Sequence, residues 1–414
     1  MFIGTEHPAR RVLHRELHAR PSLYFDGEAN VWHAAIVPDI DAPSSVADLL
    51  DTEDVSFEGD ERNGTASLGT GRLKWECHSE FVSLTYAEPA APDACLNVPS
   101  SFRHLVERTS GRLVAAVVVI VREGEAPPSF GSEGDFVASK VGGGDAEVHS
   151  SFRLSMEGFV ELHLFNRNLN SYRAGRMVRR LLEIETYRMM ALLALPVAQD
   201  TVAALPDFDR RLASLNQHLK QAGSVEKRLL SEVTHLASDI LSRSVSARQR
   251  CGATRAYADI VASRLQELRE DRVEQRQRIS TFIERRFQPS VRFIQTSEQR
   301  LDEVTQRVAM ASDLLRTAVQ VQLEEQNADL LRSMEERTRV QVHIQQAVEG
   351  FSVIAISYYA VSLAKLALES LTEVGVELHA VKLLLAMSIP ALVACVWLAI
   401  RHARRRIATP CPTH

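Results

Sequence analysis

Cysteine is scarce in this sequence, and its spacing argues against two common kinds of small stabilised domain. The 414 residues include five cysteines, and no two of them are spaced as C-x-x-C. A disulfide framework and a zinc knuckle are therefore not expected, and the cysteine usage favours a reducing compartment. The N-terminal stretch MFIGTEHPARR has no apolar run before its charges, so we expect no secretory signal and a cytoplasmic first domain.

Glycine, proline and aromatic residues are also sparse, with 19 glycines, 15 prolines and an aromatic fraction of 6%. Such a composition favours helices. The net charge of −5 is small, and we therefore expect no nucleic-acid partner.

Signature motifs of catalysis are absent as well. The sequence has no P-loop, no G-x-G-x-x-G after a strand and no G-x-S-x-G. Three glycines at 142–144 form an isolated loop signal, which is weak evidence for phosphate binding. We therefore predict no catalytic residues, no cofactor and no enzymatic activity.

Two apolar runs near the C-terminus, 351–371 and 383–400, differ from the rest of the chain. The second run carries no charge, and the first carries Lys365 and Glu369 near one end. Roughly twenty apolar residues in a helix span the hydrocarbon core of a bilayer. We predict two transmembrane helices here, in preference to two buried core helices of a soluble domain.

Charges around these runs predict their orientation. The connecting turn is acidic, with Glu373 and Glu377, whereas arginines flank both outer ends. By the positive-inside rule, the N-terminal region and the basic tail 401–414 are both expected in the cytoplasm. The arginines concerned are Arg332, Arg337, Arg339, Arg401, Arg404, Arg405 and Arg406.

The first 168 residues are rich in strand patterns, and we predict that they form a cytoplasmic α/β domain in a chain of the α+β class. Segment 72–86 alternates apolar and polar residues on both sides of a break at His78–Glu80, which is typical of a hairpin. Helices are expected over 8–20 and 100–110. The other strand-like segments are 31–37, 113–121, 146–156 and 159–166.

Strand patterns end near Tyr172, and the remaining chain is predicted to be helical. We expect a helical domain over 172–288, with a first helix stopped by Pro196 and two more over 206–250 and 254–287. Pro289 is predicted to break the chain before a long stalk helix over 290–350. Its apolar stripe has heptad spacing, so it needs neighbouring helices or other subunits as partners. The stripe comprises Ile294, Leu301, Val304, Val308, Ala311, Leu315 and Ala318.

The N-terminal stretch HPARRVLHRELHARP, residues 7–21, places two histidines four residues apart on one helical face. Its glutamate lies between them, which differs from the metalloprotease pattern H-E-x-x-H, and nearby arginines repel a divalent cation. We predict a structural or interdomain role, with an anion site as the alternative and a metal site disfavoured. The motif residues are His7, Arg10, His14, Glu16, His18 and Arg20.

Hydroxyl groups are concentrated in the first apolar run, and Glu349 stands just before it. Either they form hydrogen bonds between membrane helices or they line a polar pore with Glu349 at its cytoplasmic mouth. The sequence leaves both interpretations open. The residues are Ser352, Ser357, Tyr358, Tyr359 and Ser362.

Several stretches, among them HPARRVLHRELHARP, KWECHSEFVSLTY and GRMVRRLLEIETYRMMALLALPVA, resemble an uncharacterised bacterial family of membrane-anchored proteins with a domain of unknown function. The resemblance runs from His7 to Arg406 and implies a proteobacterial inner-membrane protein. Two positions depart from the family pattern: Cys77 stands where a basic residue is usual, and Ser151 where an acidic residue is common.

The architecture also looks like that of the CorA-type magnesium transporters, which are homo-pentamers with a pore lined by the first span. Their Gly-Met-Asn signature is absent, because the corresponding region reads LALESLTEVG. This resemblance implies a homo-oligomeric ion channel or transporter, and we take it as the first functional hypothesis. The alternative is a membrane-tethered scaffold or sensor, whose hairpin is only an anchor and whose first domain binds a cytoplasmic partner.

Overall fold

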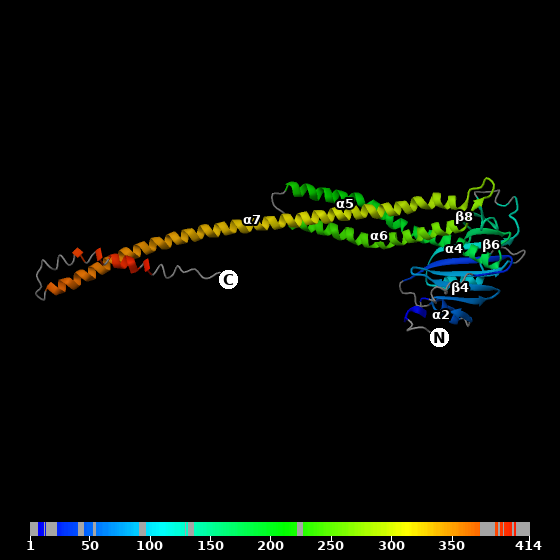
Figure 1. Cartoon of the computed structure of the whole chain (residues 1–414), viewed down its shortest axis with the longest axis horizontal. Coiled ribbons are helices and arrows are strands. Elements are labelled where there is room, and N and C mark those ends of the chain that lie inside the picture. Colours follow the sequence, from blue (N-terminus) through cyan, green and yellow to red (C-terminus); the bar gives the residue numbers. More distant parts are fainter. Residues whose placement is uncertain are drawn as a thin grey trace. The chain divides into compact units, whose positions relative to one another are not determined.

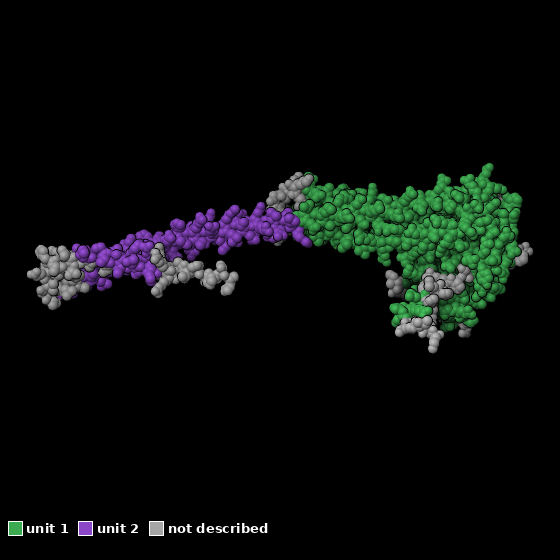
Figure 2. All heavy atoms as spheres, viewed as in Figure 1, with its two compact units in different colours: residues 1–314 green, residues 315–414 purple. Residues whose placement is uncertain are grey.

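The computed structural model describes most of the chain. The described residues are 7–11, 13, 23–39, 45–52, 55–90, 97–128, 130, 136–221, 227–372, 386–387, 390–391, 393–399 and 401–402. The protein divides into two compact units, Met1–Leu314 and Leu315–His414 (Figure 2).

One ten-stranded sheet organises the first unit, with strand order β10-β7-β8-β9-β6-β1-β5-β4-β3-β2. Neighbouring strands are antiparallel except β6 and β9, which are parallel. The strands are β1 (Ala29–Pro38), β2 (Phe57–Gly59), β3 (Asn63–Leu68), β4 (Gly71–Cys77), β5 (Val82–Pro89), β6 (Gly111–Glu123), β7 (Val137–Val141), β8 (Ala146–Leu154), β9 (Val160–Asn166) and β10 (Asp271–Arg272). The mixed α+β class is confirmed.

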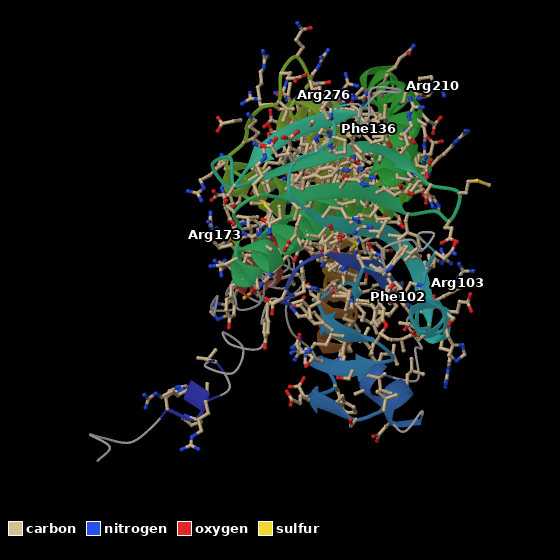
Figure 3. The ribbon with its side chains drawn as sticks, turned by 90° about the vertical axis from the view of Figure 1, so that its right-hand side faces the viewer. Phe102, Arg103, Phe136, Arg173, Arg210 and Arg276 are labelled. Carbon is tan, nitrogen blue, oxygen red and sulfur yellow. The ribbon has the colours of Figure 1, made fainter. Side chains whose placement is uncertain are left out.

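Both faces of the central strands are buried, which explains their continuous apolar sequence. In β6, Val117 and Val119 belong to one hydrophobic core, whereas Val118 and Ile120 belong to another. The second core lies under two short helices, α2 (Val46–Thr52) and α3 (Ser100–Arg108); Phe102 of α3 is fully buried there (Figure 3). A strand covered on both sides reads as an unbroken apolar run rather than an alternating one.

The other face is covered by α4 (Ser171–Leu192), which follows β9. Asn170 caps its N-terminus, since the Asn170 side chain accepts a hydrogen bond of 2.9 Å from the backbone N–H of Arg173. The helix ends before Pro196, as expected, and Pro196 lies in the first turn of the next helix, where its missing N–H costs nothing.

Three long helices continue the first unit: α5 (Leu195–Gln221), α6 (Lys227–Glu267) and α7 (Ile279–Thr372). Within the first unit, α5, α6 and the first part of α7 run alongside one another (Figure 1). Ion pairs connect each pair of them, namely Arg211 with Asp239, Arg248 with Asp302 and Arg307 with Asp209.

The heptad stripe of α7 is buried from Ile294 to Leu315, so its partners within the first unit are helices of the same chain. The stripe ends at a half-buried Ala318, just past the unit boundary. The helix boundaries differ from the predicted ones. In particular, α7 runs through Pro289 instead of starting after it. Pro289 is exposed, so the backbone carbonyl that loses its helical partner there can bind water instead.

Two helical stretches of the described residues are long and apolar enough to cross a membrane, Ser171–His218 and Ile279–Leu366. In the stretch Ser171–His218, 33% of the most apolar 18-residue segment is buried. Residues of α4 such as Leu181 and Met190 pack on the sheet, so this stretch belongs to the core of the first unit. In the second, the apolar window is entirely unburied. The stretch Ile279–Leu366 contains most of the predicted first span, and residues 386–387, 390–391 and 393–399 of the predicted second span are described as well.

Candidate functional site

The N-terminal motif is described only in part. His7 and Arg10 are exposed, and the His7 ring accepts a hydrogen bond of 3.2 Å from the backbone N–H of Ala9. The predicted residues His14, Glu16, His18 and Arg20 lie outside the described residues. Within the part of the chain that the structure describes, no cluster of three or more His, Cys, Asp or Glu residues is arranged to hold a metal ion.

The polar residues predicted near the membrane all lie on α7 and do not converge on one site. Ser352 donates a hydrogen bond of 2.9 Å to the carbonyl of Val348, Tyr358 and Tyr359 are exposed with ring centroids 5.8 Å apart, and Ser362 is exposed too. Glu349 is partly buried. The hydroxyl of Ser357 has no hydrogen-bond partner among the described residues.

A pocket that the sequence did not predict lies between the sheet and α4. Strand register builds its floor, because Lys74 of β4 and His33 of β1 both pair with Thr85 of β5 and therefore form one polar row across three strands. We call this cavity the α4 pocket; its volume is about 110 Å³. Its lining residues are Leu23, Phe25, Val31, His33, Lys74, Glu76, His78, Phe81, Ser83, Thr85, Gly175, Val178, Arg179, Leu182, Glu183, Thr186, Tyr187 and Arg264.

His33 joins the floor of the α4 pocket to its roof. One ring nitrogen lies 2.8 Å from the hydroxyl of Thr85, and the other lies 3.0 Å from the hydroxyl of Thr186 on α4. Burial lowers the pKa of His33 to about 3, so the imidazole is neutral at physiological pH. A neutral imidazole has one donor and one acceptor nitrogen, and each hydroxyl can serve either of them.

Lys74 contributes a positive charge to the same floor, although it is only 5% exposed. Its ammonium lies 3.2 Å from a carboxylate oxygen of Glu76, and burial lowers its pKa. An ammonium has three N–H donors, and Glu76 is its one ion-pair partner among the described residues. Lys74 therefore keeps donor capacity for a further acceptor inside the pocket.

Arginines and glutamates form a chain of ion pairs along the roof. Glu183 accepts from Arg179 at 2.7 Å and, on its other oxygen, from Arg264 of α6. Arg264 also contacts Glu267 at 2.6 Å, and Glu267 contacts Arg180 at 2.9 Å. We call these five residues the Arg–Glu chain.

The α4 pocket carries a small positive excess and a partly apolar wall. Three of its lining residues, Lys74, Arg179 and Arg264, are basic, and two, Glu76 and Glu183, are acidic. Val31, Phe81, Val178 and Leu182 supply apolar surface. This arrangement suits a small organic anion, whose charged group contacts Lys74 and whose carbon skeleton lies against the apolar side chains.

The rim of the α4 pocket is held by the turn between β4 and β5. The His78 ring stacks on Phe81, with centroids 4.1 Å apart, and one of its nitrogens lies 3.3 Å from the hydroxyl of Ser83. Glu80 of the same turn accepts hydrogen bonds from Arg250, at 3.0 Å, and from Tyr257, at 2.6 Å, both on α6. The rim is therefore anchored to a helix distant in sequence.

The family model described as "Protein of unknown function (DUF3422)" matches residues 5–407. The chain belongs to the DUF3422 family. The match includes the N-terminal motif and both units, so the DUF3422 model covers the α4 pocket as well as the apolar part of α7. Among curated proteins, none matches this DUF3422 chain.

The pocket of this DUF3422 protein escaped prediction because its floor has the pattern of an exposed surface. Lys74 and Glu76 alternate with Leu73 and Trp75, which is typical of a strand with one face in water. One available signal was the polar face of α4, where Arg179, Glu183 and Thr186 recur at helical spacing.

Proposed function

We propose that this DUF3422 protein is a membrane-tethered sensor whose first unit binds a small carboxylate-bearing molecule in the α4 pocket. The observation that carries the proposal is the burial of Lys74 beside a cavity. A buried ammonium is costly unless its hydrogen-bond donors are satisfied, and Glu76 satisfies only part of them. A bound carboxylate would satisfy the rest.

The size of the α4 pocket also favours a ligand over packing alone. Its volume of about 110 Å³ is several times what one water molecule needs. A sheet–helix interface that serves only stability is normally filled with apolar side chains, because voids and buried charges both reduce stability. Here the same interface combines the void with Lys74, His33 and three buried hydroxyl side chains, those of Ser83, Thr85 and Thr186.

The membrane part of the proposal rests on the apolar, unburied window of α7 and on the uncharged run 383–400. We propose that both cross the bacterial inner membrane, with the N-terminal unit and the basic tail in the cytoplasm. The part of α7 between the first unit and the first proposed span exposes apolar residues such as Leu330 and Ile344. They support association of several copies along this helix.

Replacing Lys74 by methionine tests the sensor proposal, because methionine is unbranched and only one atom shorter than lysine, and it removes the charge. Full-length protein in non-ionic detergent is titrated with acetate, succinate and glutarate by calorimetry. A charged hydrogen bond is worth about 1.5–3 kcal/mol, so we expect Lys74→Met to weaken binding by about 10- to 100-fold.

Lys140→Met is the matched control, because Lys140 lies on β7 of the same sheet and does not line the α4 pocket. It should bind as the unmodified protein does. If none of the three carboxylates binds, or if Lys74→Met binds as tightly as the control, the sensor proposal is wrong.

Ion conduction by a CorA-like homo-oligomer is the second candidate, and one observation favours it. The Ser357 hydroxyl, in the first proposed span, lacks a partner among the described residues, and a neighbouring subunit or water in a pore would satisfy it. The test combines the subunit number in mild detergent with ion flux in vesicles.

A further inference from the structure

A second hollow lies on a different face of α4 from the α4 pocket and is lined by arginines. Its volume is about 490 Å³. We call it the arginine groove; it is lined by Gly142, Leu169, Arg173, Arg176, Met177, Arg180, Ser263, Gln266, Glu267 and Arg269. Arg173 lies at the outer edge of α4 in Figure 3.

The arginines are brought together by helical spacing and by the end of α6. Arg173, Arg176 and Arg180 are three and four residues apart, so they share one face of α4. Arg269 follows the C-terminus of α6, where its backbone has a φ of 48°, uncommon for a residue with a side chain. A hydrogen bond of 3.2 Å from its N–H to the carbonyl of Gln266 holds this conformation.

Gly142, the first residue of the glycine loop 142–144, lines one side of the arginine groove. The N–H of Gly142 donates a hydrogen bond of 2.8 Å to the carbonyl of Leu268, so the β7–β8 turn is tied to the end of α6. All three glycines have positive φ, and a side chain at 143 or 144 would meet no neighbour, so the loop beyond Gly142 is open.

Only part of the positive charge of the arginine groove is balanced. Arg173 is paired with Asp145, and Arg180 with Glu267. Arg176 and Arg269 are both exposed, and no carboxylate of the described residues lies within ion-pair distance of either. The four guanidinium groups of the groove therefore have two carboxylate partners, Asp145 and Glu267, and two of the guanidinium groups keep their donors available.

We propose that the arginine groove binds the phosphate group of a soluble small molecule. Guanidinium groups present paired N–H donors that match the oxygens of a phosphate, and several converging on one anion favour a doubly charged group over a single carboxylate. The groove is wide and lacks the enclosed apolar wall of the α4 pocket, so the phosphate group supplies most of its recognition. This proposal is independent of what the α4 pocket binds.

The experiment measures binding of inorganic phosphate and pyrophosphate to the full-length protein in non-ionic detergent, by calorimetry at low ionic strength. We expect saturable binding that weakens with added salt, because the contacts are exposed ion pairs. Arg176→Gln and Arg269→Gln should each weaken binding at least fivefold. Neither residue has an ion pair among the described residues, so both variants should keep the fold, which melting temperatures will check.

Arg153→Gln is the matched control. Arg153 is exposed and lies near the end of β8, about 20 Å along the strand from the glycine loop. Equal binding by Arg176→Gln, Arg269→Gln and this control, or no phosphate binding at all, would overturn the proposal. A parallel arm uses vesicles of phosphatidylglycerol in phosphatidylcholine and the same variants. Binding to these vesicles without binding to either soluble anion would assign the groove to lipid headgroups and overturn the soluble source.

Discussion

Two histidines on the sheet, the buried His33 and the half-buried His163, have pKa values far from that of a free imidazole. Burial lowers the pKa of His33 to about 3 and that of His163 to about 4. An unfolded histidine titrates near 6.5, so below this pH the unfolded chain binds protons that the folded chain does not. The contribution of these two histidines to stability is therefore constant above about pH 6.5 and decreases as the pH falls toward 4.

Replacing His33 by glutamine should reduce this acid sensitivity. Between pH 7.5 and pH 5.0, each of the two histidines is expected to remove roughly 2 kcal/mol of stability. Thermal melting of the full-length protein at both pH values should therefore show a smaller pH-dependent decrease for His33→Gln. His104→Gln, on the exposed side of α3, is the matched control for the substitution itself. An unchanged pH dependence in His33→Gln would contradict the assignment.

At the scale of elements, the entry of the chain into the first strand is packed tightly against α4. A side-chain carbon added at Gly175 would lie 1.9 Å from the carbonyl oxygen of Leu23, so the two backbones are in contact. Leu23 and Phe25 line the α4 pocket, and their position therefore depends on this close approach. Glycine at 175 is required by packing rather than by backbone conformation.

Gly175→Ala should displace Leu23 and lower both stability and carboxylate binding. Overpacking of this kind costs about 1–3 kcal/mol. The control is Gly252→Ala in α6, where the added carbon meets no neighbour and stability should rise by roughly 0.5–1 kcal/mol. Melting temperatures and calorimetric titrations would measure both effects. Equal stability of the two variants would contradict the prediction and show that the backbone at Leu23 can move away from residue 175 at little cost in free energy.

The elements that could be predicted from sequence were those whose own residue pattern indicates whether they are buried or exposed. The run 113–121 indicated a strand because it is apolar throughout, and it lies within β6, buried on both faces. The break at His78–Glu80 likewise marked the turn between β4 and β5. The prediction that a helix begins after Pro289 was wrong, because α7 runs through this residue. The free-energy cost of a proline inside a helix depends on whether solvent or core surrounds it, and one sequence does not specify this.

At the scale of the whole molecule, most of the proposed functional geometry depends on contacts between distant segments. The α4 pocket combines strands near residues 33, 74 and 85 with helices near 183 and 264, and no local pattern predicts that meeting. The membrane segments are different, because length and apolarity are properties of one segment alone. Their assignment from sequence stays a prediction.

Subunit number decides whether ion conduction is feasible. We expect the full-length protein to be a homo-oligomer in mild detergent, measured by light scattering with the detergent mass subtracted. A closed ring of four or more, with ion flux in vesicles that Ser357→Ala alters and the exposed control Ser246→Ala does not, would support conduction. A monomer or dimer, or a ring without flux, would contradict conduction and leave the sensor proposal standing.

The Arg–Glu chain has a consequence for how two anions would share the first unit. Arg179 and Arg264 line the α4 pocket, Arg180 lines the arginine groove, and Glu183 and Glu267 connect them. An anion in the arginine groove that attracts Arg180 would weaken the Arg180–Glu267 ion pair. Glu267 would then hold Arg264 more strongly and draw Arg264 away from the α4 pocket. The two occupants would then be antagonists, and by thermodynamic reciprocity each would lower the affinity of the other by the same factor.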